Sequence, residues 1–198
     1  MDEVPTMTDL GPQADRVKKL LDGVDDSRLG DPTPCEAYTV GDLVNHLVGL
    51  TAAFRDAAAK DLGPSTDVDP GAPAPPLPGD WRTRLPRQLD ELAAGWRSEE
   101  AWTGETRAGG VTLPGEVAGL VVANELVLHG WDLARATGQL YEADPDALRA
   151  SVEMLSQSLD PGQRDEIFGP VVEVPQDAPL LDRAVGLGGR RPDWAPVG

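Results

Sequence analysis

One long helical pattern, residues 114–138, constrains the fold more than any other stretch of the chain. Pro114 suits the first turn of a helix, and Gly138 is a suitable residue to end one. Between them an apolar stripe at helical spacing meets Glu125 and His129, which lie four residues and therefore one turn apart. Burying these two groups without partners would cost several kcal/mol. The pattern therefore predicts a long core helix that carries a polar site.

Four further amphipathic helices are predicted from apolar residues at helical spacing, over residues 9–24, 40–60, 81–97 and 145–159. Thr39 is a plausible N-cap for the second of them, with Asp42 three residues later as a weak capping box. Asp144 is the expected N-cap of the last helix, with Pro145 at its first position.

The segments between these helices are rich in proline and glycine. Residues 61–80 contain six prolines and are predicted to form a loop, either a mobile flap or a cover over a site. Residues 103–114 are predicted to be another irregular crossing. In the tail we expect a short extended piece at 170–175 and a short helix near 179–187. Because alternating β-branched runs are scarce and no repeat is visible, we expect one all-α domain spanning residues 1–198.

The second histidine of the chain is the reason to consider a metal site. Of the two histidines, His46 falls beside the apolar stripe of the helix predicted at 40–60. One His from one helix, with Glu125 and His129 from another, supplies enough donors to hold a divalent metal with an open position. A surface ion pair, or a buried neutral histidine bonded to a carbonyl, also accounts for the pattern, so the alternatives stay open on the residues alone.

Two aspartates are candidates for the surroundings of such a site. Asp42 precedes His46 by one turn, and Asp132 follows His129 by three residues. Metal-binding histidines usually donate their second N–H to a carboxylate or a carbonyl, and either aspartate could accept it. For Asp42, a capping or solvated position is the favoured reading.

Three other side chains near these motifs have two readings each. Trp131 could line a pocket or belong to the core. Arg135 could meet an anionic substrate or interact with the C-terminal end of its helix. Cys35 could supply a thiol near the site, although a single cysteine is more often a small buried hydrophobe.

The composition narrows the partners and the location. Acidic residues outnumber basic ones 34 to 17, which gives a formal charge of −17 and disfavours nucleic acid and anionic membranes as partners. One cysteine excludes an internal disulfide, and the acidic N-terminus does not resemble a signal peptide. No run of 18 apolar residues suggests a membrane span. We therefore expect a cytoplasmic protein that acts on a small-molecule substrate, with a homodimer as one option.

Three segments carry a resemblance to a known family. PTPCEAYTVGDLVNHLVGL, at residues 32–50, resembles the start of the DinB-like, mycothiol-dependent maleylpyruvate isomerase N-terminal family, although Tyr38 stands where that family usually has Trp. NELVLHGWDLARATGQ, at residues 124–139, resembles its second metal-binding helix. FGPVVEVPQDAPLLDRAVGLGGRRPDW, at residues 168–194, is similar to the ending of actinobacterial members.

The resemblance implies both a fold and a chemistry. It implies a DinB-like four-helix bundle, here with extra C-terminal helices and an irregular tail. It also implies a divalent metal, typically zinc with nickel or iron as alternatives, held by His46, Glu125 and His129. Characterised relatives use a low-molecular-weight thiol such as mycothiol as cosubstrate. The isomerase carries a further C-terminal domain that we do not expect in this chain, so its substrate stays open.

The expected function is therefore that of a metal-dependent enzyme that activates a thiol, most simply mycothiol, for S-transfer or isomerisation of a small metabolite. One alternative is metal-assisted hydrolysis, elimination or cyclisation without a thiol. A second alternative is a non-catalytic metal-binding stress protein. A fourth protein ligand, or a site closed to solvent, would favour the last of these.

Overall fold

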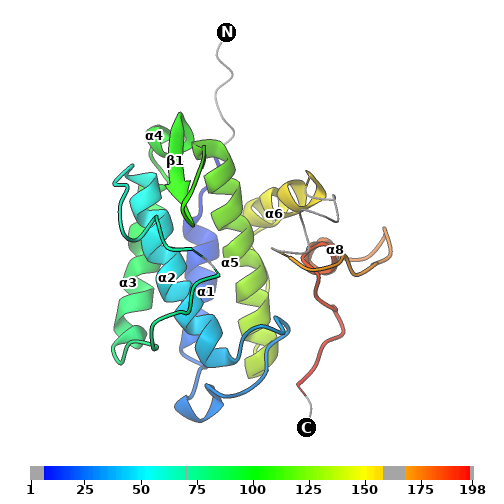
Figure 1. Ribbon diagram of the computed structural model, residues 1–198. Helices are drawn as coiled ribbons and strands as arrows, with labels where there is room; N and C mark the ends of the chain where they lie inside the picture. Colours follow the sequence, from blue (N-terminus) through cyan, green and yellow to red (C-terminus); the bar gives the residue numbers. More distant parts are fainter. Residues whose placement is uncertain (1–6, 70, 158–167, 197–198) are drawn as a thin grey trace.

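Four long helices form the body of the protein. The computed structural model describes residues 7–69, 71–157 and 168–196. In this part of the chain α3 and α5 each pack against both α1 and α2, around one hydrophobic core (Figure 1). The all-α, four-helix-bundle prediction is confirmed. The bundle helices are α1 (Gly11–Leu21), α2 (Val40–Ala58), α3 (Trp81–Gly95) and α5 (Gly115–Thr137).

Shorter elements surround the bundle. A 3₁₀ turn, η1 (Asp26–Arg28), precedes α2, and a short helix, α4 (Glu99–Trp102), follows α3. The expected extra C-terminal helices are α6 (Pro145–Gln157), which packs on α5, and α8 (Leu180–Leu187), which packs on α6. The far end of the predicted helix at 145–159 lies outside the described residues.

The helix boundaries follow the local signals in the sequence. Thr39 accepts a hydrogen bond from the Asp42 backbone N–H, while the Asp42 side chain accepts one from the Thr39 backbone, so the predicted capping box is present. Asp144 caps α6 by accepting from two backbone N–H groups of its first turn. Gly138 ends α5 in the left-handed region at a φ of 71°. These predictions are confirmed.

The long helix α5 is buried on more than one face. Its consecutive residues 126–134 are all buried, because α1 and α2 cover one side of it and α6 covers the other. The apolar stripe predicted at helical spacing on this helix includes Val117, which is exposed, so the prediction is wrong at that residue. By length and composition alone α5 could cross a membrane, but 78% of its most apolar window is buried inside the protein. Its apolar character is that of a core helix.

Residues 103–114 are not the irregular crossing that the sequence suggested. They contain an antiparallel hairpin of β1 (Glu105–Ala108) and β2 (Val111–Pro114), joined by Gly109 and Gly110. Both glycines have positive φ, the backbone that a two-residue hairpin turn requires. The Thr106 hydroxyl donates to the Ala57 carbonyl oxygen at 2.6 Å and ties the hairpin to the end of α2. Four-residue strands are too short to show alternation, which explains the wrong prediction.

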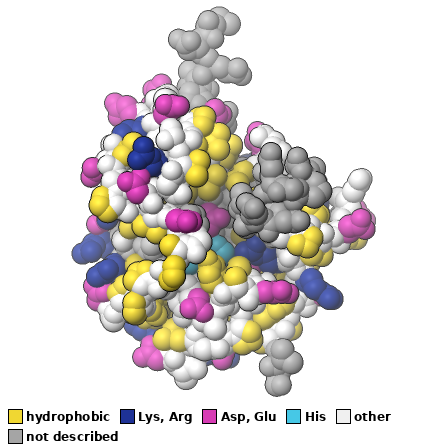
Figure 2. Space-filling view, viewed as in Figure 1, with side chains coloured by type: hydrophobic (Ala, Val, Ile, Leu, Met, Phe, Trp, Pro, Cys, Tyr) yellow, Lys and Arg dark blue, Asp and Glu magenta, His cyan; other side chains and the backbone are white. Residues whose placement is uncertain are grey.

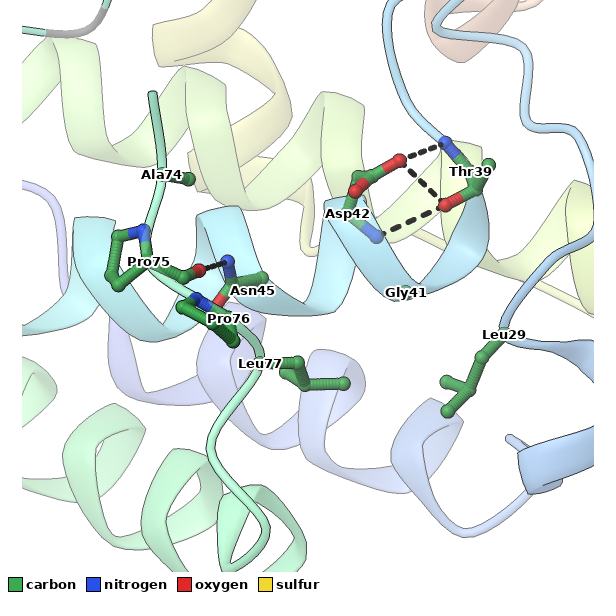
Figure 3. A pocket seen from close by; sticks show the side chains of 9 residues that line it. All are labelled: Leu29, Thr39, Gly41, Asp42, Asn45, Ala74, Pro75, Pro76 and Leu77. Carbon is green, nitrogen blue, oxygen red and sulfur yellow. Dashed lines mark hydrogen bonds between the residues drawn. The ribbon is translucent and has the colours of Figure 1, made fainter. Parts of the chain in front are cut away.

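The proline-rich loop covers the N-terminal half of α2. Asn45 donates its side-chain amide to the Pro75 carbonyl oxygen at 2.6 Å, and Leu77 packs against the core. Between the loop and the helix lies a cavity of about 550 Å³ (Figure 3). Its lining includes none of the three candidate metal donors, so it is separate from them; the lining residues are Leu29, Thr39, Gly41, Asp42, Asn45, Ala74, Pro75, Pro76 and Leu77. Mobility of the loop stays a prediction.

Candidate metal centre

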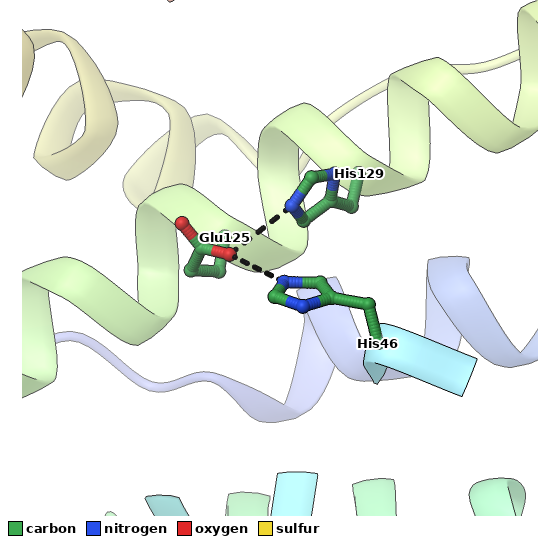
Figure 4. Close-up of side chains that lie close together, drawn as sticks. All are labelled: His46, Glu125 and His129. Atoms are coloured by element: carbon green, nitrogen blue, oxygen red, sulfur yellow. Dashed lines mark hydrogen bonds and ion pairs between the residues drawn. The ribbon is translucent and has the colours of Figure 1, made fainter. Parts of the chain in front are cut away.

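Two bundle helices bring the three predicted donors together. His46 points from α2 toward α5, where Glu125 and His129 lie one turn apart (Figure 4). Glu125 Oε2 lies 3.1 Å from Nε2 of His46 and 3.1 Å from Nε2 of His129. The ligand atoms of all three residues lie within 4.8 Å of one another. The packing of α2 on α5 therefore joins donors that are 79 residues apart in the sequence.

The donor set fits a divalent cation. Zinc bonds imidazole nitrogen and carboxylate oxygen at about 2.0–2.2 Å, so tetrahedral ligand atoms lie roughly 3.4 Å apart. The 3.1 Å separations from Glu125 Oε2 are close to that value and are also the lengths of direct hydrogen bonds, and the ligand atoms of all three residues lie within 4.8 Å of one another. Among the residues that the structure describes, no fourth His, Cys, Asp or Glu joins the group. These three residues could hold a metal while leaving a position for another ligand.

Each histidine has a partner on its other ring nitrogen. His129 Nδ1 lies 3.0 Å from Asp132 Oδ2, and His46 Nδ1 lies 3.3 Å from the Tyr38 hydroxyl. The Tyr38 ring also stacks on the His46 ring, with centroids 5.2 Å apart. Partners of this kind fix the ring orientation and the tautomer, which directs both Nε2 atoms toward Glu125.

The two aspartates suggested by the sequence differ in outcome. Asp132 is fully buried and contacts His129 as expected. Asp42 is occupied by its capping box with Thr39, and its hydrogen bonds in the described structure do not include His46. The partner of His46 Nδ1 is the Tyr38 hydroxyl instead of Asp42. We predicted no role for Tyr38 from the sequence. The one signal was that Tyr38 stands where the family usually has Trp.

Trp131 and Arg135 do not join the three donors. Trp131 is buried, with 5% of its surface exposed, as expected for a core residue. Arg135 donates from Nε and Nη2 to the Trp194 carbonyl oxygen, so it holds the C-terminal tail against α5. Its guanidinium lies 5.8 Å from the centre of the Trp131 ring. The suggested role of Arg135 in substrate binding therefore has no support from its contacts.

The charges at the centre reinforce one another. Burial alone would raise the pKa of Glu125, but the charges and hydrogen bonds of His129 and His46 outweigh burial and hold that pKa well below its usual range. Burial alone would lower the pKa of His129, but Glu125 and Asp132 outweigh burial and raise it to about 9. The site therefore favours positive charge beside Glu125.

One side of the centre is open to solvent. The His129 side chain is 7% exposed and Glu125 is 19% exposed, whereas His46 is 27% exposed. Figure 2 shows histidine surface (cyan) in a recess of this face of the protein. Of the three donors, His46 is therefore the most exposed to solvent. Cys35 is partly exposed, and burial raises the pKa of its thiol despite the nearby charge of Arg190.

Comparison with known proteins gives a consistent family relationship. The family model described as "Mycothiol maleylpyruvate isomerase N-terminal domain" matches residues 10–134, which include all three donors. Two uncharacterized proteins of Mycobacterium tuberculosis, MT0763 and Rv0738, are each 32% identical over 143 residues, covering 67% of this chain and 67% of theirs.

Solved structures show the same fold. The crystal structure of the mycothiol-dependent maleylpyruvate isomerase matches with a TM-score of 0.56 at 22% identity, and a mutant of that isomerase matches with 0.53 at 21%. Each match covers 74% of this chain and 66% of the isomerase chain. The present chain thus spans about two thirds of the isomerase, and the likeness establishes the fold alone.

Proposed function

Because the chain belongs to the mycothiol maleylpyruvate isomerase N-terminal domain family, we propose that it is a metal-dependent enzyme that activates a low-molecular-weight thiol. Mycothiol is the thiol named by the family, and S-transfer or isomerisation of a small metabolite is the reaction class. One observation carries the proposal: His46, Glu125 and His129 form a cluster in which each histidine has a hydrogen-bonding partner at Nδ1 and in which the His46 side is exposed to solvent.

The residues divide into binding and orienting groups. His46, Glu125 and His129 would bind the ion, with zinc the expected metal. When bound, the ion would supply Lewis acidity that lowers the pKa of a thiol or water in the open position. Asp132 holds the His129 ring and Tyr38 holds the His46 ring, so the donors need little rearrangement.

The charge of this donor set favours an anionic partner. Two neutral imidazoles and one carboxylate leave one positive charge on a dication, and a thiolate would neutralise it. His46 is partly exposed whereas His129 is buried, so a thiol would approach the metal from the side of His46. A purely structural metal would gain nothing from this opening, which supports an enzyme over a metal-binding stress protein.

We expect metal binding to release about one proton per site at pH 7. Without metal, a pKa of about 9 keeps His129 protonated at that pH, and the imidazole must lose its proton before Nε2 can coordinate. Zinc affinity should therefore rise with pH and level off above about pH 9. Calorimetric titration in buffers of different ionisation enthalpy measures the proton count. Zinc binding at pH 7 with no proton release would contradict this description of the metal-free site.

The reaction class is tested by the dependence of activity on thiol. The zinc-loaded protein is incubated with small unsaturated or electrophilic metabolites, with and without mycothiol, and the products are followed by mass spectrometry. Turnover only in the presence of the thiol supports the proposal, and loss of that turnover in His46→Ala ties it to this centre. Equal turnover without thiol would instead favour metal-assisted hydrolysis, elimination or cyclisation.

A further inference from the structure

A buried arginine in the C-terminal tail lies behind the centre. Asp132 is fully buried, and its Oδ2 atom has two partners. One is Nδ1 of His129 at 3.0 Å, and the other is Nη2 of Arg190, also at 3.0 Å. Arg190 Nε lies 3.4 Å from Asp132 Oδ1, so the guanidinium spans both carboxylate oxygens. The chain of contacts runs from Arg190 through Asp132 to a candidate metal ligand.

The backbone of the tail holds Arg190 in this position. Its N–H donates to the Val185 carbonyl oxygen at the end of α8, and its Nη1 donates to the Gly188 carbonyl oxygen at 2.6 Å. Gly189 has a φ of 79°, and a Cβ there would lie 2.2 Å from the Phe168 carbonyl oxygen. Only glycine fits this turn, which directs the next side chain inward to α5. The Arg190 side chain is 8% exposed as a result.

We propose that Arg190 is a positioning residue for the metal centre, which makes the C-terminal tail a working part of that centre. The family model matches residues 10–134, so this role falls on a segment that it does not cover. The guanidinium fixes the Asp132 carboxylate, Asp132 fixes the His129 ring, and Nε2 of His129 then faces Glu125. The inference rests on the proposed metal function.

A general stabilising effect of the tail is the competing explanation. Arg135 offers a matched control, because it also anchors the tail to α5, through the Trp194 carbonyl oxygen, but its described hydrogen bonds do not involve Asp132. Arg135→Gln loosens the same tail without touching the contact chain. Arg190→Gln breaks that chain and leaves the buried Asp132 without its arginine partner.

The test compares Arg190→Gln, Arg190→Lys and Arg135→Gln in the full chain. Zinc affinity is measured by chelator competition, and the geometry of the centre by the visible absorption of the cobalt-loaded protein. Outer partners of metal ligands affect affinity by roughly 10–100-fold. We expect Arg190→Gln to weaken zinc binding by about tenfold and to change the cobalt spectrum. Arg190→Lys keeps the charge but cannot contact both carboxylate oxygens of Asp132, so it should recover part of the zinc affinity and part of the cobalt spectrum. Arg135→Gln should leave the zinc affinity and the cobalt spectrum unchanged.

A metal-independent measurement separates this inference from the proposed function. The proton that His129 Nδ1 shares with Asp132 should give a downfield NMR resonance in the metal-free protein, retained in Arg135→Gln and shifted or lost in Arg190→Gln. If the wild-type protein bound no metal, the proposed function would fail, and this resonance would still decide whether Arg190 orients His129. An unchanged resonance, affinity and cobalt spectrum in Arg190→Gln would overturn the inference. So would equal losses in Arg135→Gln.

Discussion

Replacing His129 by alanine should remove most of the bound metal, and His46→Ala should do the same. Each change deletes one of three donors, so the loss in affinity should exceed the roughly 10–100-fold that changes in outer partners cause. Glu125→Gln should weaken binding as well, because a neutral amide is a poorer ligand for a dication. Elemental analysis of the purified variants, followed by zinc titration, measures the effect. The wild-type protein should hold close to one divalent ion per chain.

Glu116→Gln is the matched control for these variants. Glu116 lies on the same helix as Glu125 and His129 but is exposed in its first turn. Its replacement removes one negative charge without touching the centre, so metal content should stay at the wild-type level. Full metal occupancy in all three donor variants would show that the ion binds elsewhere.

Adding mycothiol to the cobalt-loaded protein should produce a sulfur-to-metal charge-transfer band. A thiol near neutral pH is mostly protonated, given a reference pKa of about 8.5 for cysteine. The positive charge left by two imidazoles and a carboxylate should favour the thiolate, so close to one proton should be released for each thiol bound. Absorption spectroscopy and a pH-indicator titration record the two signals.

His129→Ala should abolish both signals, because it disrupts the centre that holds the cobalt. Asp42→Asn is a useful comparison, since Asp42 lies one turn from His46 but belongs to the capping box of α2. That variant should keep both signals. Tight binding of the thiol with an unchanged cobalt spectrum would show that its sulfur is not a ligand. Metal-assisted chemistry without a thiol ligand would then be the better account.

The parts of the fold that the sequence predicted are those with local causes. The Thr39 capping box, the Asp144 cap and the left-handed Gly138 each depend on a few neighbouring residues, and each is where the sequence placed it. The hairpin at residues 105–114 was missed because its strands are short and its stability comes from contacts with α2 and α5. Helical spacing also left open which face of α5 is covered by α6.

Of the candidate centre, the sequence predicted the three metal donors but not all of the residues that contact them. Glu125 and His129 share a helix face. His46 became a candidate because the chain has only two histidines. Asp132 was accessible by spacing, since it lies three residues from His129 on the same helix. Tyr38 and Arg190 were not assigned because their contacts with the centre depend on a loop and on a turn 58 residues beyond Asp132. Such contacts leave no periodic signal in the sequence.

Anomalous X-ray scattering at the zinc edge, from crystals of the protein grown with zinc, tests the central claim most directly. The account predicts one strong peak per chain, within bonding distance of Nε2 of His46, Nε2 of His129 and a carboxylate oxygen of Glu125. A fourth, non-protein ligand should lie on the open side, near His46. A peak elsewhere, or none at this position with zinc present at saturating concentration, would contradict the account.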